Sequence, residues 1–169
     1  MTAVEVREAR DAELDLAGRI VADAYAALGE VDEHEQWYLD QVRDARGRSR
    51  QCPVLVAVDA PSGALLGCVT YVPGAGNPFA ELEREGEAGF RMLGVDPAAQ
   101  GRGAGEALVL ACIARARAAG KRALAISTAP EMHAAHRLYA GAGFARRPDC
   151  DWSPGSGEAL LAYGLALAP

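Results

Sequence analysis

The stretch Gln100-Gly101-Arg102-Gly103-Ala104-Gly105 lies between two segments of different character. An apolar-rich segment, residues 90–95, precedes it and ends in Asp96-Pro97, and a segment rich in Ala, Leu and Arg, residues 106–119, follows it. The glycines therefore occupy a predicted strand–turn–helix junction. The first turn of a helix has unpaired backbone N–H groups and a partial positive charge, and glycine lets an anion approach that backbone closely. The stretch predicts a site for a pyrophosphate group.

The spacing of these glycines differs from that of two other phosphate-binding motifs. The dinucleotide fingerprint is G-x-G-x-x-G, whereas the glycines here follow G-x-G-x-G, and no acidic residue follows at a strand end about 20 residues later. The P-loop requires Gly-Lys-Ser or Gly-Lys-Thr, and the stretch contains no lysine. For the stretch taken alone, a glycine-rich helix start that binds no ligand stays the alternative.

A second segment, Met132 to Phe144, follows at a distance that leaves room for one helix and one strand. It carries Leu138-Tyr139 in a helical context and leaves through Gly143-Phe144 towards a strand. Together with the pattern Gln-x-x-Gly-x-Gly after a strand, it resembles the two signature motifs of GNAT-type acetyltransferases. More narrowly, three segments are similar to a branch of small bacterial GNAT proteins: Phe-Arg-Met-Leu-Gly-Val-Asp-Pro, Ala-His-Arg-Leu-Tyr and Asp151-Trp152.

The resemblance implies a single GNAT domain over residues 1–169. Its fold would be α/β, with about seven strands in a mixed, splayed sheet and helices on both faces, which agrees with the order of predicted strands and helices. The implied co-substrate is acetyl-CoA, whose pantetheine arm pairs in this family with the strand backbone before the glycines, here at Leu93 and Val95. The residues expected at its pyrophosphate, mainly through backbone amides, are Gln100, Gly101, Arg102, Gly103, Ala104, Gly105 and Glu106.

Tyr139 takes, by this resemblance, the position of the family's general acid. The unperturbed pKa of tyrosine is about 10, so its phenol can donate a proton to a departing thiolate. A core aromatic whose hydroxyl is bonded elsewhere stays the alternative, because Tyr139 shares the inward-facing stripe of its predicted helix with Met132 and Leu138. The family often carries an Asn at the position of Met132, so a side-chain hydrogen bond from that position to the pantetheine is not expected.

The general base is expected to be Glu87, which has the same strand parity as Leu93 and Val95 if the strand begins that early. Its carboxylate would then face the acyl end and act through a water molecule. The alternative is that Glu87 is one more solvated acid in a run that also contains Glu81, Glu83 and Glu85.

The acceptor is expected at Asp32, Glu33 and His34, which belong to the helix–loop–helix region that usually forms the acceptor wall in this family. These residues would bind a cationic substrate, or they are ordinary surface charges. His133 and His136 are expected on the outward face of their helix as solvated histidines, and no further ligand has the spacing of a metal site. We therefore expect no metal.

Composition limits the class of partner. The net charge of −6, from 17 basic and 23 acidic residues, argues against a nucleic-acid-binding surface and mildly favours a cationic amine as substrate. No apolar run approaches the roughly 20 residues that span a bilayer, and no secretory signal is apparent. The four cysteines show no metal or redox spacing. We expect a cytoplasmic protein without membrane or nucleic-acid partners, and a homodimer is common for the family.

Two local patterns give further expectations. Thr128-Ala129-Pro130-Glu131 has the S/T-x-x-E form of a capping box and predicts the start of the next helix. The arginine-rich segment 43–50 is expected to be a solvated loop, with contact to the cofactor's ribose phosphate as the alternative.

Taken together, the sequence predicts an acetyl-CoA-dependent N-acetyltransferase that acts on a primary amine of a small molecule or peptide by direct attack in a ternary complex. Two alternatives stay open: a GNAT fold that binds or senses acyl-CoA without chemistry, and a dinucleotide-dependent enzyme. A proton-donating Tyr139 argues against the sensor, and the glycine spacing argues against the dinucleotide enzyme.

Overall fold

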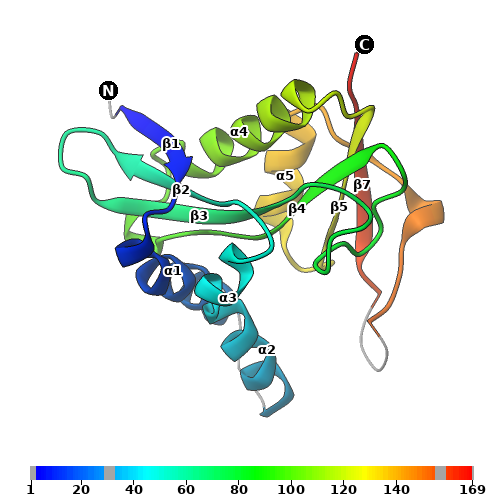
Figure 1. The fold of residues 1–169 in the computed structure, drawn as a ribbon. Coiled ribbons are helices and arrows are strands. Elements are labelled where there is room, and N and C mark those ends of the chain that lie inside the picture. Colours follow the sequence, from blue (N-terminus) through cyan, green and yellow to red (C-terminus); the bar gives the residue numbers. More distant parts are fainter. Residues whose placement is uncertain (1–2, 29–32, 155–158, 169) are drawn as a thin grey trace. The chain divides into compact units, whose positions relative to one another are not determined.

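Figure 1 shows the computed structural model, which describes residues 3–28, 33–154 and 159–168. Within these residues, seven strands form a mixed sheet in the order β1-β2-β3-β4-β5-β7-β6, so the expected α/β fold class is confirmed. The strands are β1 (Val4–Glu8), β2 (Val54–Asp59), β3 (Leu65–Val72), β4 (Glu87–Val95), β5 (Ala123–Thr128), β6 (Ala145–Arg146) and β7 (Leu161–Ala166). The α-helices are α1 (Leu14–Ala26), α2 (Glu33–Arg43), α3 (Ala45–Ser49), α4 (Ala104–Ala118) and α5 (His133–Gly141).

The chain divides into two compact units. The first comprises Met1–Tyr71 and Met92–Leu108, and the second comprises Val72–Arg91 and Val109–Pro169. The boundary between residues 91 and 92 lies inside β4, and the boundary between residues 108 and 109 lies inside α4. Each of these two elements therefore contributes residues to both units. The expectation of a single domain over residues 1–169 stays a prediction.

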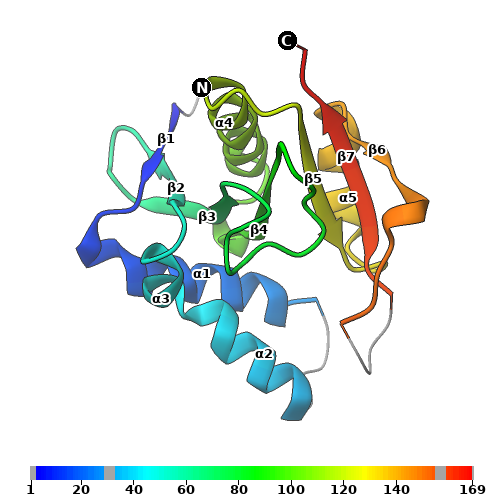
Figure 2. The same ribbon diagram turned by 45° about the vertical axis from the view of Figure 1, so that its right-hand side comes forward.

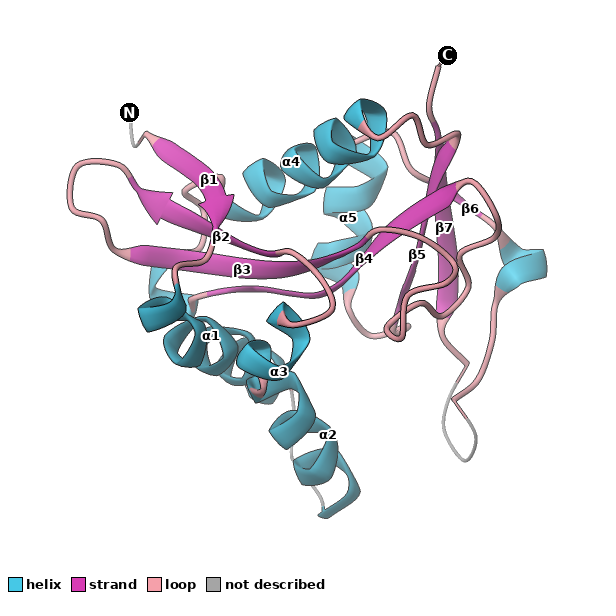
Figure 3. Cartoon of the chain, viewed as in Figure 1, coloured by secondary structure: helices cyan, strands magenta, loops and turns pink. Residues whose placement is uncertain are grey.

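The first unit is built on antiparallel pairing of β1 with β2 and of β2 with β3. β2 and β3 form a hairpin whose turn contains Pro61-Ser62-Gly63. Helices α1 and α3 lie against one face of these strands, and α2 packs against α1 and extends away from the sheet (Figure 3). The apolar core beneath them contains Leu14, Ala17, Val21, Ala22, Val42, Ala45, Val54, Val56, Val58, Cys68 and Met92. On the opposite face, a side chain at Gly67 would meet Leu108 at the start of α4.

The second unit is organised around β5. The start of β4 pairs with β5 in parallel through Glu87↔Ala123 and Ala88↔Leu124, and β5 pairs with β7 antiparallel along its whole length. Helix α5 lies against β5 and β7 (Figure 2), and its Tyr139 ring packs on Tyr163 of β7 with centroids 6.1 Å apart. Phe90 of β4 and Phe144 complete this aromatic cluster, at 5.7 and 5.9 Å from the Tyr139 ring.

Met92 interrupts β4, because its φ of 55° lies in the left-handed region that residues other than glycine rarely adopt. The alternation of side chains along a strand depends on continuous extended backbone. β4 begins at Glu87, as the sequence-based expectation required. The break at Met92 interrupts the alternation, however, so counting residues no longer shows that Glu87 lies on the same face of the strand as Leu93 and Val95.

The capping box predicted at Thr128 is wrong. Thr128 is the last residue of β5, and α5 begins only at His133, with Met132 as its N-cap and no side-chain hydrogen bond at that cap. Thr128 belongs to the strand because it pairs with Leu161 of β7.

The arginine-rich segment is not a solvated loop. It forms helix α3, which Asp44 caps by accepting a hydrogen bond of 2.9 Å from the N–H of Gly47. The Arg48 side chain is buried and donates to the Thr70 hydroxyl at 3.0 Å and to the Gln41 carbonyl at 2.8 Å. This segment is ordered by hydrogen bonds to residues outside it, such as Thr70. The local composition of the segment does not reveal these partners.

No helix within the described residues is both long enough and apolar enough to cross a membrane.

An ion pair between β1 and the turn before α1 gives a prediction about stability. Arg7 donates to both carboxylate oxygens of Glu13, at 2.7 and 2.9 Å, and this pairing lowers the pKa of Glu13 to about 2. A lowered folded-state pKa stabilises the fold above the unfolded pKa, and that stabilisation is lost as the pH falls from about 4.5 towards about 2. Glu13→Gln should lower Tm at pH 7 by about 2–4 °C, with the difference from wild type disappearing at low pH.

Thermal melts between pH 7 and pH 2 measure this difference. Glu131→Gln, at an exposed position, is the control and should behave like wild type throughout. A Glu13→Gln difference that does not change with pH would mean that packing rather than charge is responsible.

Candidate active site

The glycine stretch has the backbone geometry of an anion site. Gly101 and Gly103 adopt φ values of 82° and 83°, and both are exposed, with no atom within 4 Å of the point where a Cβ would lie. Gly103 caps α4, since its carbonyl accepts the N–H of Ala107 at 3.0 Å. The N–H groups of the following residues, Ala104 to Glu106, therefore have no partner within the helix and are available to a bound anion.

Arg102 holds this turn in place. Its guanidinium donates to Asp59 at 2.7 Å, and Asp59 also accepts a hydrogen bond from the Ser62 hydroxyl. The Ser62 hydroxyl is the main cause of the lowered pKa of Asp59, and Arg102 contributes to it. The turn is thus tied to the β2–β3 hairpin before any ligand binds, and the Arg102 side chain is engaged with a carboxylate.

The other residues predicted at the cofactor lie on either side of this turn. Gln100 and Glu106 are exposed, Gly105 is half-buried, and Ala104 is buried, so Ala104 offers only its backbone. Leu93 and Val95 have half-buried side chains on β4, in the same unit as the turn. Their pairing with a pantetheine arm stays a prediction.

Tyr139 is buried in the aromatic cluster of the second unit, with 5 % of its surface exposed. Burial raises the pKa of its phenol, so the hydroxyl remains protonated at neutral pH. Its ring packs against the rings of Phe90, Phe144 and Tyr163. The ring is therefore part of the aromatic core, and the role of the hydroxyl stays a prediction.

Glu87 is 1 % exposed and is surrounded by groups that bind its carboxylate. One oxygen accepts the N–H of Arg84 at 2.9 Å, and the other lies 3.2 Å from Arg147 and 3.8 Å from Arg122. It is therefore not a solvated acid. The Glu87 carboxylate is therefore already engaged by a backbone N–H group and two guanidinium groups.

Glu81 and Glu83 form a second pair of acids, which in the sequence are only members of an acidic run. The Glu83 carboxylate accepts the N–H groups of Glu81 and Leu82 at 2.6 and 3.1 Å, and it fills the space where a side chain at Gly89 would lie. Glu81 pairs with Arg91 of β4 at 2.6 Å and its side chain is 15 % exposed. Burial, opposed by Arg91 and reinforced by Glu83, raises the pKa of Glu81 to about 7.

The pKa of about 7 sets Glu81 apart from an ordinary glutamate. Such a value suits a group that exchanges protons near neutral pH. In the sequence, Glu81 is only one of four acids separated by single residues, and nothing marks it out. The pKa shift depends on burial and on the packing of Arg91 and Glu83 around the carboxylate.

The predicted acceptor residues are only partly described. Glu33 and His34 are the first two residues of α2, and Asp32 lies outside the described residues. Their role stays a prediction.

His136 is not a solvated histidine. Its side chain is half-buried, Nε2–H donates to the Ala129 carbonyl at 3.0 Å, and its ring lies 5.8 Å from the Tyr163 ring. His133 is exposed as expected. In the part of the chain that the structure describes, no three His, Cys, Asp or Glu side chains are grouped so as to hold a metal ion.

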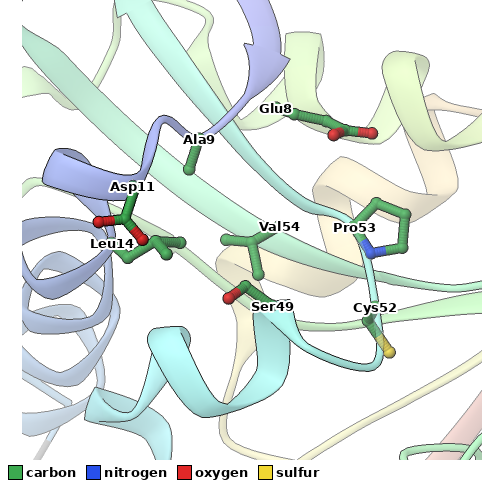
Figure 4. A pocket seen from close by; sticks show the side chains of 8 residues that line it. All are labelled: Glu8, Ala9, Asp11, Leu14, Ser49, Cys52, Pro53 and Val54. Carbon is green, nitrogen blue, oxygen red and sulfur yellow. The ribbon is translucent and has the colours of Figure 1, made fainter.

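A small cavity of about 220 Å³ lies in the first unit, beside the start of α1 (Figure 4). Its lining residues are Glu8, Ala9, Asp11, Leu14, Ser49, Cys52, Pro53 and Val54. None of the predicted site residues lines it, and we assign it no role.

Comparison with known proteins agrees with this geometry. The sequence pattern that defines the Acetyltransferase (GNAT) family matches residues 18–144, which is well over half of the chain. No curated protein matches the sequence significantly.

Several solved structures share the fold. A GCN5-related N-acetyltransferase from Kribbella flavida is 25 % identical, with a TM-score of 0.69 and 98 % of each chain covered. YncA from Salmonella typhimurium, solved with its cofactor acetyl-CoA, is 20 % identical, with a TM-score of 0.64 over 99 % of this chain and 96 % of that one. PaiA N-acetyltransferase from Thermoplasma acidophilum, in complex with coenzyme A, is 14 % identical, with a TM-score of 0.73 over 98 % and 99 % of the two chains.

Proposed function

This chain belongs to the Acetyltransferase (GNAT) family, and we propose that it transfers the acetyl group of acetyl-CoA to a primary amine. The observation that carries the proposal is the turn before α4, where Gly101 and Gly103 have positive φ and leave open space above unpaired amides. Backbone amides at a helix start bind phosphate without side-chain charge, which suits a protein of net charge −6. Two structures of the same fold hold acetyl-CoA or coenzyme A.

The residues proposed to hold acetyl-CoA are those expected from the sequence. Gly103, Ala104, Gly105 and Glu106 offer amides to the pyrophosphate, with Gln100, Gly101 and Arg102 shaping the turn. Arg102 acts here through its backbone, because its side chain is paired with Asp59. Leu93 and Val95 offer the backbone of β4 to the pantetheine arm.

Acetyl transfer needs one proton removed and one supplied. The amine nitrogen forms a bond to the carbonyl carbon, the carbon–sulfur bond breaks, and the thiolate of coenzyme A takes up a proton. We assign this proton donor to Tyr139, because its phenol stays protonated at neutral pH and its place in the second motif is that of the family's general acid.

Two carboxylates are candidates for the base that accepts the amine proton. Glu87 is the residue expected from the sequence, but Arg147 and Arg122 already neutralise it. Glu81 has a pKa of about 7, so near neutral pH it is partly ionised and basic enough to accept a proton. We therefore propose Glu81 as the base and Glu87 as the alternative, and the pH dependence of the rate distinguishes them.

The acceptor is proposed to be a small-molecule or peptide amine, with Asp32, Glu33 and His34 as candidate contacts. The direct test is release of free thiol from acetyl-CoA in the presence of a panel of amines, amino acids and peptides. Turnover with at least one amine supports the enzyme. Tight binding of acetyl-CoA without turnover for any amine would instead identify a binding module.

The turn before α4 gives the first prediction about function. Gly103→Glu places a negatively charged side chain in the open space above the amides and strains a backbone of φ 83°. The affinity for acetyl-CoA, measured by calorimetry, should fall roughly 10- to 100-fold because charge-assisted hydrogen bonds to phosphate are lost.

Gly63→Glu is the matched control for that variant. Gly63 has a φ of 75° and equally open surroundings, but it lies in the β2–β3 turn. Its substitution should leave the affinity unchanged. Equal losses in both variants would show that backbone strain alone is responsible.

The second prediction concerns the proton donor. Tyr139→Phe keeps the ring in its cluster and removes only the hydroxyl, so kcat should fall roughly 10²- to 10⁴-fold while acetyl-CoA affinity and Tm stay near wild type. An acyl thioester with a more acidic thiol should recover part of the lost rate, since its thiolate leaves without protonation.

Tyr163→Phe is the control for Tyr139→Phe, because both rings belong to the same aromatic cluster. It should change kcat little. A Tyr139→Phe variant that turns over like wild type would show that water protonates the sulfur.

The third prediction separates the two candidate bases. Above pH 7 the Glu81 carboxylate is ionised, so kcat/KM of the wild type should fall as the pH drops through about 7. Glu81→Gln should lower kcat/KM by roughly 10²-fold or more and remove this acidic limb. Glu87→Gln should keep the limb and lower Tm, because it leaves Arg147 and Arg122 without their shared carboxylate.

Glu85→Gln, at an exposed position in the same acidic run, is the control and should have no effect. If Glu87→Gln removes the limb and Glu81→Gln does not, Glu87 is the base.

A further inference from the structure

Helix α5, which carries Tyr139, starts without a side-chain cap. It is nine residues long, and Met132 at its N-cap makes no side-chain hydrogen bond. A helix of this length gains little stability from its own backbone, and its first N–H groups have no partner within the helix. Contacts with the rest of the second unit therefore decide where α5 begins and how it is held.

One such contact runs from His136 to the connection between β5 and α5. The half-buried His136 ring donates its Nε2–H to the carbonyl of Ala129 at 3.0 Å. The same carbonyl accepts the N–H of Met132 at 3.1 Å, so it closes the turn that leads into the helix. Ala129 directly follows Thr128, which is paired with Leu161 of β7. His136 thus ties α5 to the end of a strand that is fixed in the sheet.

The rings around His136 connect it with Tyr139. The two residues are three positions apart on one helix, so they are neighbours on its surface. Both rings pack on Tyr163 of β7, with centroids 5.8 Å away for His136 and 6.1 Å away for Tyr139 (Figure 2). Tyr163 is itself buried, and the Arg146 guanidinium lies 5.6 Å from the centre of its ring. His136 therefore holds the side of the helix from which Tyr139 projects.

The opposite end of α5 is fixed by its backbone. Gly143 has a φ of 98°, and the N–H of Phe144 returns to the carbonyl of Tyr139 at 3.0 Å. This is the pattern of a helix that ends in a left-handed glycine. Loss of the His136 contact should therefore loosen the start of the helix and leave its end in place.

We propose that His136 is a positioning residue for the proton donor Tyr139, acting through its hydrogen bond to the Ala129 carbonyl. This inference rests on the proposed function, because it needs Tyr139 to protonate the departing thiolate. By fixing α5 against the end of β5, the hydrogen bond sets where the Tyr139 hydroxyl lies. Proton transfer requires the donor within hydrogen-bond distance of its acceptor, and a displacement of about 1 Å can lower a rate about 100-fold.

His136→Phe tests the proposal, because it keeps a ring against Tyr163 and removes the N–H group. We expect kcat to fall roughly five- to fiftyfold, while the affinity for acetyl-CoA, measured by calorimetry, changes by less than about twofold. His136→Gln retains an N–H donor and should recover most of the rate. His133→Phe is the matched control, since it makes the same exchange at the exposed neighbouring histidine, and it should leave kcat unchanged.

A double mutant shows whether His136 acts through Tyr139. If it does, Tyr139→Phe removes the group that His136 positions, so adding His136→Phe should not lower kcat further. An acyl thioester with a more acidic thiol should also restore part of the rate of His136→Phe. Losses that multiply in the double mutant, or equal losses in His133→Phe and His136→Phe, would overturn the proposal.

Amide hydrogen exchange tests the anchoring independently of turnover. Exchange in the first turn of α5 should be faster in His136→Phe than in wild type, and close to wild type in His136→Gln. His136→Leu repeats both measurements if the phenylalanine variant does not fold. Unchanged exchange or unchanged kcat in an active enzyme that lacks the N–H group refutes only the role of His136. A wild-type protein that binds acetyl-CoA but acetylates no amine refutes the proposed enzymatic function instead.

Discussion

Strand β4 supplies side chains to two different cores, and the break in its backbone at Met92 makes this arrangement possible. Phe90 packs with Tyr139 in the second unit, whereas Met92 lies in the apolar core of the first. A regular strand would place residues 90 and 92 on one face. The left-handed backbone of Met92 costs roughly 1–3 kcal/mol, so the packing around its buried side chain has to hold it there. The separate roles of the two halves of β4 follow from this break.

Charge pairing in the second unit divides the acids into two kinds. Glu87 has two guanidinium groups within 4 Å, whereas Glu81 and Glu83 both lie in the field of Arg91. With both guanidinium groups at its carboxylate, Glu87 links segments that are far apart in the chain. An acid that shares one cation with a second carboxylate in a largely buried site gains a pKa near neutrality. Two glutamates from the same run thus acquire different chemistry from their surroundings alone.

The proposed anion site of the first unit is already ordered by contacts within the protein. The Asp59 carboxylate accepts hydrogen bonds from Arg102 and from the Ser62 hydroxyl, and these bonds connect the glycine turn to the β2–β3 hairpin. A turn held in this way does not need to be ordered by the ligand, so binding loses less free energy to ordering. In the second unit, the rings of Phe90, Phe144 and Tyr163 pack against Tyr139 and fix the position of its ring.

Features that depend on neighbouring residues could be predicted from the sequence, whereas the pairing of polar groups required the folded chain. The strand–turn–helix junction at Gly101 to Gly105, the β2–β3 hairpin and the helix that carries Tyr139 all follow from local patterns of apolar residues and glycines. The family could also be predicted, because each of its two motifs is a short local pattern. The distance between the motifs is set by the helix and the strand that separate them. Arg147, in contrast, reaches Glu87 from 60 residues away, and Thr128 does not cap α5 because β5 extends to meet β7. Burial and charge partners arise from contacts between distant segments, and the pKa of a side chain and the satisfaction of its hydrogen bonds depend on those contacts rather than on the residue's neighbours in the chain.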